Sequence, residues 1–190
     1  QKMAARIEGI GTGTLTIDQI GSTNVLRSTG AISLEFDTII QNYPVVTPSL
    51  TATARSGHIV LNNISNDVGS IDLRSRIGQS VGVGSGFISF NNNADLSIAG
   101  ISTTGDVEVT AQGIMTQTGA IAADTLTLTS RSNSTITHTL LDATNNVREL
   151  SFSGQNAFGT SSGVANLNFA DADALALADV DTGGALRVVT

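Results

Sequence analysis

Short stretches in which apolar and polar residues alternate recur along almost the whole chain of 190 residues. This period-two pattern is typical of β-strands with one buried face, and apolar spacing typical of helices is hard to find. The recurring unit is a small residue, most often Gly, followed by two apolar residues that are separated by one residue. It predicts twelve strands, which open at Gly13, Gly30, Gly57, Gly69, Gly86, Ala94, Gly105, Asp124, Arg148, Ala165, Asp173 and Gly184. We expect the apolar pairs to point inward and the opening glycines to supply the positive φ of a sharp corner.

The unit itself belongs to a longer repeat. Four successive openings, at Gly69, Gly86, Ala94 and Gly105, recur with the same spacing at Arg148, Ala165, Asp173 and Gly184. This 79-residue offset relates residues 69–111 to residues 148–190 without a gap. Internal repeats of this kind indicate a stacked architecture, in which neighbouring units complete a core that one unit cannot bury alone.

The sequence therefore predicts an all-β fold, a right-handed parallel β-helix (β-solenoid) formed by residues 1–190 as a single segment. With about 20 residues per turn, such a chain makes about nine turns and a rod about 45 Å long. Tandem β-sandwiches of about 80 residues also fit the repeat length, although sandwich cores usually contain Trp or Tyr, and this chain has no Trp and one Tyr. A β-propeller needs a period of about 40 to 50 residues, which does not occur.

Residues 35–56 fit the pattern less well. This segment contains Tyr43 and both prolines, Pro44 and Pro48. Because proline is excluded from the interior of a strand ladder, we expect an inserted loop or edge excursion from the rod here. The same three residues mark it as a candidate partner-binding loop.

The segment 57–190 carries a resemblance to a known family. It contains the strings GHIVLNNISNDVGSIDL and NADLSIAGISTTGDVEVTAQGIMTQTGAIAADTLTLT, and a variant, ADALALADVDTGGALRV, follows at 172–188. These strings resemble the strand-repeat regions of large bacterial exoproteins of the filamentous-haemagglutinin-like type, including two-partner-secretion and autotransporter-type adhesins. The resemblance covers 134 of 190 residues. It implies a parallel β-helix, secretion across the outer membrane and a role in attachment, aggregation or biofilm, and it transfers no catalytic residue.

Composition excludes several function classes. Nine cations against 16 acids give a net charge of -7, so a basic stripe for nucleic acid is absent. The absence of Cys excludes disulfide scaffolds and Cys-based zinc sites. No apolar run is long enough for a membrane span. The start at Gln1 indicates a processed or excised segment, and the hydroxyl- and amide-rich composition favours a secreted or surface-displayed bacterial protein.

Four acidic residues near the C-terminus could provide oxygen ligands for calcium: Asp171, Asp173, Asp179 and Asp181. The third Asp and the closing Glu of a full calcium loop are missing, so an ordinary solvated acidic face explains the same residues. Apart from this calcium alternative, the sequence implies no cofactor.

The sequence gives little support to a catalytic function. A polysaccharide-cleaving β-helix needs convergent carboxylates, for which Asp72, Asp106 and Glu108 qualify by type only, since alternation makes Asp72 and Glu108 point outward. His58 and His138 occupy related places in the repeat. We expect both at corners or on the surface, about 20 Å or more apart and unable to share a metal.

The expected function is therefore structural and non-enzymatic: a repeat module of an adhesive fibre that mediates attachment, aggregation or matrix and filament formation. Its expected partners are a host or matrix surface, of glycan or protein, and other copies stacked end to end, because the strand pattern runs to both ends without a polar cap. A carbohydrate-active β-helix enzyme and a glycan-binding module are the alternatives.

Overall fold

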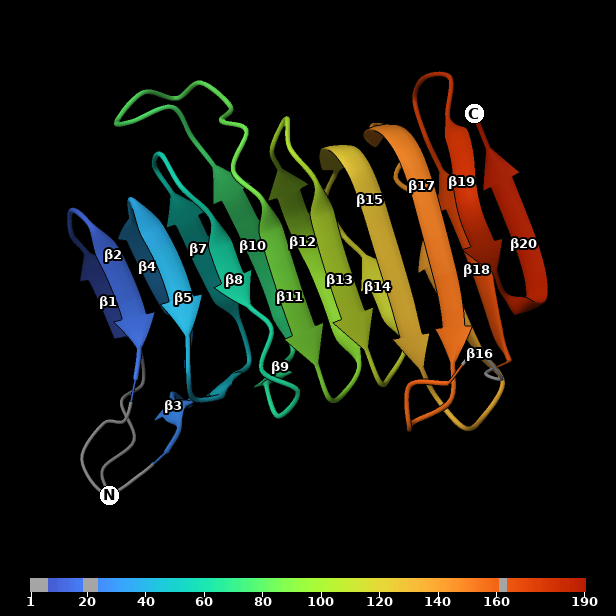
Figure 1. The fold of residues 1–190 in the computed structure, drawn as a ribbon, viewed down its shortest axis with the longest axis horizontal. Helices are drawn as coiled ribbons and strands as arrows, with labels where there is room; N and C mark the ends of the chain where they lie inside the picture. Colours follow the sequence, from blue (N-terminus) through green and yellow to red (C-terminus); the bar gives the residue numbers. More distant parts are fainter. Residues whose placement is uncertain (1–6, 19–23, 161–163) are drawn as a thin grey trace.

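The computed structural model describes residues 7–18, 24–160 and 164–190. In this part of the chain every regular element is a β-strand, and the strands wind into a parallel β-solenoid of about 8 turns. Figure 1 shows the turns side by side along the longest axis, from β1 and β2 at one end to β19 and β20 at the other. The predicted all-β solenoid is therefore confirmed.

Two stacks of parallel strands form the walls of the solenoid. Stack A contains β1 (Ile7–Ile10), β4 (Ile32–Phe36), β7 (Leu50–Ala54), β10 (Ser70–Ser75), β12 (Leu96–Ser102), β14 (Met115–Gln117), β16 (Ile136–Leu140), β18 (Ala165–Ala170) and β20 (Gly183–Val189). Stack B contains β2 (Thr14–Ile17), β5 (Thr38–Gln41), β8 (Ile59–Leu61), β11 (Ile88–Asn92), β13 (Val107–Ala111), β15 (Ile121–Arg131), β17 (Asn146–Gln155) and β19 (Ala176–Asp181). We call the side where the chain passes from A to B the AB edge and the opposite side the BA edge.

The number of residues in a turn varies along the solenoid. In stack B the paired interior residues are Leu15, Ile39, Ile59, Ile88, Val107, Leu126, Leu150 and Leu177. The interval from Ile59 to Ile88 is about one and a half times the next interval, from Ile88 to Val107. The expected nine turns are therefore about one too many, because loops at the edges lengthen several turns beyond the length expected from the sequence.

Short strand pairings also line the edges. At the BA edge β3 (Leu26–Arg27), β6 (Val45–Thr47) and β9 (Asp67–Val68) form a small three-stranded sheet. At the AB edge the end of β12 pairs with the start of β15, which pairs with the start of β17. The long strands β15 and β17 therefore span both the AB edge and the wall of stack B.

The interior is filled by the aliphatic and aromatic residues of both stacks. The inward pairs predicted for the units from Gly30 to Ala165 are all buried, including Phe90, Phe152 and Phe169. The last two units differ, since Leu177 is 48% and Leu186 37% exposed. Within the described residues, β19 and β20 each pair with a neighbour on one side only, so no further turn covers these side chains.

The proposed role of the opening glycines is wrong for most of them. Among the described glycines only Gly13, Gly78, Gly159 and Gly183 have a positive φ. Glycine is needed at the other corners because successive turns approach closely there. A Cβ atom on Gly86 would collide with the carbonyl oxygen of Gly57, and one on Gly105 would lie 2.5 Å from that of Ser85.

The excursion expected for residues 35–56 is also wrong. This segment contains β5, β6 and β7, and each of these strands pairs with the turn before it and the turn after it. Pro44 and Pro48 lie immediately outside β6, so neither interrupts a ladder. Prolines at the corners of a turn are compatible with a solenoid because the corners lie between strands.

The 79-residue offset corresponds to an exchange of the two stacks. It relates β10, β12 and β18 of stack A to β17, β19 and β11 of stack B. Hydrogen bonds follow the same offset: the amide of Val68 donates to Oδ1 of Asn92 at 2.9 Å, and the amide of Val147 to Oδ1 of Asp171 at 3.0 Å. The first bond lies at the BA edge, where Val68 pairs within the small sheet, and the second at the AB edge.

Close approach at the glycine corners predicts that Gly86→Ala destabilises the protein by about 2 kcal/mol, because the new methyl group overpacks the corner against the backbone of Gly57. The free energy of unfolding from urea titration measures the effect. Gly82→Ala is the control, since its Cβ would meet side chains alone, the hydroxyl of Ser80 at 3.3 Å and Ile77 at 3.6 Å, and we expect a change within about 0.5 kcal/mol. Equal effects of the two substitutions would contradict the close-approach explanation.

Candidate functional site

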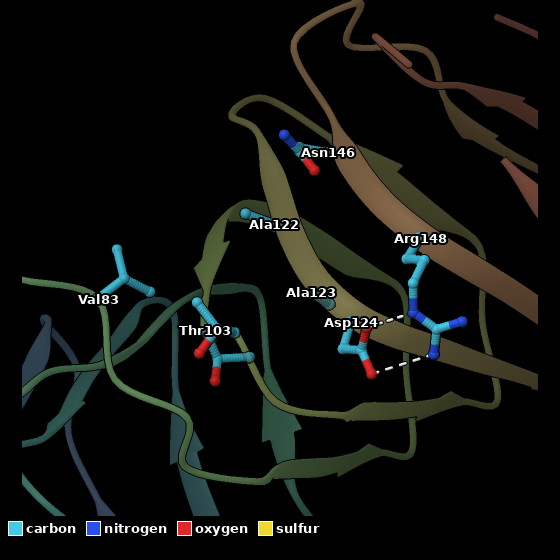
Figure 2. A pocket seen from close by; sticks show the side chains of 8 residues that line it. Val83, Thr103, Ala122, Ala123, Asp124, Asn146 and Arg148 are labelled. Carbon is cyan, nitrogen blue, oxygen red and sulfur yellow. Dashed lines mark hydrogen bonds and ion pairs between the residues drawn. The ribbon is translucent and has the colours of Figure 1, made fainter. Parts of the chain in front are cut away.

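A pocket of about 320 Å³ lies on the AB edge, and we call it the edge pocket. Three successive turns and one loop line it, with the residues Val83, Thr103, Thr104, Ala122, Ala123, Asp124, Asn146 and Arg148. Figure 2 shows Val83 on one side and the pair Asp124 and Arg148 on the other, with Ala122 and Ala123 between them. The turn after β12, the start of β15 and the start of β17 thus contribute its polar groups.

Asp124 and Arg148 form a two-pronged ion pair across neighbouring turns. Nε of Arg148 donates to Oδ1 of Asp124 at 2.5 Å, and Nη2 donates to Oδ2 at 3.1 Å. This hydrogen bonding holds the pKa of the Asp124 carboxyl below its usual value and raises the pKa of Arg148. Glu149 adds a second carboxylate 3.5 Å from Nη1 of Arg148. The cation of Arg148 is therefore compensated by two carboxylates.

The loop that carries Val83 is fixed to the next turn by a threonine. Oγ1 of Thr103 donates to the carbonyl oxygens of Gly86 at 2.7 Å and Gly84 at 3.2 Å. The amide of Thr104 also donates to the carbonyl oxygen of Gly84, at 2.8 Å. The buried hydroxyl of Thr103 thus holds the end of the loop 76–87 against the turn that follows β12 and forms one wall of the edge pocket.

A second pocket, of about 340 Å³, lies on the BA edge. Its lining consists of Gly69, Asp95, Leu96, Ser97, Ile114 and Thr116. Oδ1 of Asp95 accepts a hydrogen bond of 2.7 Å from the amide of Ile114, so its carboxylate already stabilises the backbone of the next corner. The edge pocket is the better candidate because an ion pair, Asp124 with Arg148, and the side-chain amide of Asn146 line it together.

The four candidate calcium ligands do not form a cluster. Asp171 is buried and accepts hydrogen bonds from the amides of Val147 at 3.0 Å and Asp173 at 3.3 Å, whereas Asp173, Asp179 and Asp181 are exposed. In the described ranges no group of three or more His, Cys, Asp or Glu side chains is placed to hold a metal ion. Asp171 is a corner residue that orders the backbone between β18 and β19.

The carboxylates considered for catalysis lie in different stacks. Asp72 is in stack A, where Arg74 donates two hydrogen bonds of 2.8 Å to its carboxylate. Glu108 is exposed in β13 of stack B, and Asp106 is exposed just before that strand. These three carboxylates therefore do not converge.

Tyr43, Pro44 and Pro48 lie together in the corner between β5 and β7. Tyr43 and Pro44 are half-buried and Pro48 is exposed. The carbonyl oxygen of Pro44 accepts a hydrogen bond of 2.9 Å from the amide of Leu26 in the turn before. The corner is therefore tied into the small sheet at the BA edge, and partner binding by these side chains stays a prediction.

The expectation that His138 lies at a corner or on the surface is wrong. Its side chain lies in the interior of stack A. Its Nδ1 accepts a hydrogen bond of 2.9 Å from the amide of Met115, and its ring stands edge-on to Phe152 with centroids 5.7 Å apart. Burial lowers the pKa of His138 to about 4. His58 is exposed at the AB edge, as expected, and its Nδ1 accepts from the amide of Phe87. The two histidines thus lie apart, one at the AB edge and one inside stack A.

The residues of the edge pocket were not candidates from sequence. Asp124 and Arg148 each open a strand unit, and their separation along the chain equals that of Leu126 and Leu150, which are paired interior residues of adjacent turns. An acid and a base separated by one turn length predict a contact between turns. The sequence reveals this ion pair only when the number of residues in the turn from β15 to β17 is known.

A scan against protein-family models finds no match, and searches of the curated proteins and of the solved structures likewise find none. No helix in the described part of the chain is long and apolar enough to cross a membrane. The fold therefore defines the class to which this chain belongs. It is an all-β parallel solenoid of about 8 turns.

Asp171 and Asn92 form a matched pair for a test of the corner residues. Nδ2 of the buried Asn92 donates to the carbonyl oxygens of Val68, Ala94 and Asp95 at 3.1–3.2 Å, whereas a carboxylate at position 171 has no protons to donate. Burial raises the pKa of Asp171 above its ordinary value of 3.8. Its ionisation therefore costs folding stability, and this cost is present above the folded-state pKa and disappears below about pH 3.8.

We expect Asp171→Asn to raise the free energy of unfolding by about 1 kcal/mol at pH 7, with the gain shrinking as the pH falls toward 3.8. The reciprocal Asn92→Asp should lower it at pH 7, because a carboxylate replaces an amide that donates to three carbonyl oxygens. Urea titrations across this pH range measure both. A loss of stability in Asp171→Asn at pH 7 would show that the carboxylate is the preferred group.

His138 predicts that the protein loses stability as the pH falls, whereas the unfavourable contribution of Asp171 disappears as the pH falls. Its folded-state pKa of about 4 lies below its ordinary value of 6.5, so protonation favours the unfolded chain. This contribution is fully present above pH 6.5 and decreases as the pH falls toward 4, by about 2 kcal/mol between pH 6.5 and 4.5. Urea titration of His138→Leu should show that this part of the acid loss is removed. An acid loss in His138→Leu as large as that of the unmodified chain would refute the assignment.

Proposed function

We propose that this chain is a non-enzymatic structural and adhesive repeat module of a secreted or cell-surface bacterial fibre. The observation that carries the proposal is the uninterrupted parallel pairing of both stacks, from β1 and β2 to β19 and β20. A rod of this kind holds its corner loops at fixed spacings on a long surface. The resemblance of residues 57–190 to strand-repeat regions of bacterial exoproteins supports the same role.

The rod is suited to bearing loops because its two edges tolerate insertions. The loop 76–87 lies between β10 and β11, and both strands keep parallel pairing with the turns before and after them. It presents Ile77 and Val81, which are 64% and 93% exposed, and the BA edge presents Phe158, which is 88% exposed. Exposed apolar side chains at loop tips are the kind of group that contacts a partner surface.

In this proposal the partners are a host or matrix surface and other copies of the same module. The last turn exposes Leu177, Leu186 and Val189, and stacking of a further solenoid turn would cover them. Such a turn can come from the same polypeptide or from a second copy. Both arrangements extend the fibre and keep the same strand pairing.

Attachment is tested with beads that carry the purified protein in a flow chamber coated with extracellular matrix. We expect these beads to stay bound under shear that removes beads coated with an unrelated protein of the same net charge. Beads with the Gly86→Ala variant, compared at a temperature where only that variant is unfolded, should detach. Release of reducing ends or unsaturated products from polysaccharides by the protein, or retention no better than the control, would overturn the proposal.

A further inference from the structure

We infer that the edge pocket binds a short neutral oligosaccharide. This inference rests on the proposed function, because it names the chemical class that one part of the adhesive surface recognises. Four features of the pocket carry it: its shape, the apolar part of its lining, its polar groups with free hydrogen-bonding capacity and its charge balance.

The shape fits a short chain of rings rather than a single small ion. The pocket crosses three successive turns, represented by Thr104, Asp124 and Arg148, and adjacent turns lie about 4.8 Å apart. Its polar groups are therefore spread over about 10 Å along the rod. The volume of about 320 Å³ lies at the lower end of the range of small-molecule sites. An elongated ligand of two or three sugar rings matches these dimensions.

Part of the pocket lining is apolar. Ala122 and the mostly buried Ala123 lie between the polar groups, and Val83 lines the opposite side from the loop 76–87 (Figure 2). Thr103 holds this loop in place through the carbonyl oxygens of Gly84 and Gly86. Short apolar side chains on a fixed backbone suit the C–H faces of sugar rings, which gain by leaving water.

The polar groups have hydrogen-bonding capacity that the protein does not use. Within the described residues the side-chain amide of Asn146 makes no hydrogen bond to protein, and it stands at the rim of the pocket in Figure 2. Oγ1 of Thr104 donates to the carbonyl oxygen of Gly84 at 3.3 Å and retains its lone pairs as acceptors. Asp124 and Arg148 bond each other and retain further lone pairs and N–H groups for a ligand. Planar donors and acceptors of this kind match vicinal hydroxyl groups.

The charge balance selects against anions. Arg148 is the cation of the pocket, and it is compensated by Asp124 and by Glu149, while Asp106 acts on it electrostatically from two turns before. The local net charge is negative, so a carboxylated or sulfated sugar would meet like charge. A neutral polyhydroxyl ligand meets no such cost.

The test is isothermal titration calorimetry of the purified protein with three neutral probes, cellotriose, maltotriose and triacetylchitotriose, and one anionic probe, trigalacturonate. We expect saturable binding of at least one neutral probe. In Asn146→Ala its affinity should fall about tenfold, the equivalent of one hydrogen bond. Asp124→Asn should also weaken it. Asp72→Asn is the matched control, because Asp72 and Arg74 form a similar two-pronged pair outside the pocket, and binding should be unchanged.

The inference is overturned if no neutral probe binds at about 10 mM, if trigalacturonate alone binds, or if Asn146→Ala and Asp124→Asn bind as the unmodified chain does. Far-ultraviolet circular dichroism confirms that each variant keeps its strand content. Bead retention separates this inference from the proposed function. If Asn146→Ala beads stay attached and no sugar binds, the adhesive role stands and the sugar site fails, whereas loss of retention in the unmodified chain contradicts both.

Discussion

The structure depends on parallel hydrogen bonding between each turn of backbone and the turns on either side of it. In a ladder of this kind a residue at an interior position lies directly above or below its counterparts in neighbouring turns. One polar side chain there therefore changes the packing of several turns. The series from Ile39 to Leu150 in stack B shows the outcome, with an aliphatic residue at every paired interior position. His138 is an exception to this rule in stack A, and its neutral imidazole is accommodated by the amide of Met115 and the ring of Phe152.

At the edges the chain must change direction while its backbone stays paired with the neighbouring turns. Buried amides do this in two related places: Nδ2 of Asn66 donates to the carbonyl oxygen of Asn91, and Nδ2 of Asn145 to that of Ala170. Glycines let the corners of successive turns touch, as Gly86 does above Gly57. Because these contacts act between turns, loops of different length can leave the same edge without shifting the strands. The edge pocket arises where one such loop lies beside corners with small side chains.

Much of the fold was predictable because strand pairing in a solenoid imposes period two on the sequence. The units from Gly30 to Ala165 all become strands with buried apolar pairs. Besides the strands in residues 35–56, the sequence pattern misses β14 and β16, because their interior positions include the polar residues Gln117 and His138, which break the apolar pattern. The corners could not be predicted from single residues, since the need for glycine there comes from the preceding turn. The edge pocket was missed for the same reason, because its polar residues come from three turns whose lengths the sequence does not state.

The most direct test of the stacked fold is disulfide formation between cysteines introduced at paired outward positions, which is clean because the chain contains no Cys. Glu108 and Thr127 are partners in adjacent turns, and Ser151 follows Thr127 one turn later. With adjacent turns about 4.8 Å apart, cysteines at 108 and 127 are within disulfide reach, whereas those at 108 and 151 are about 10 Å apart and are not. We predict rapid oxidation of the first pair and none of the second. Failure of the first pair, or equal oxidation of both, would contradict the parallel stack.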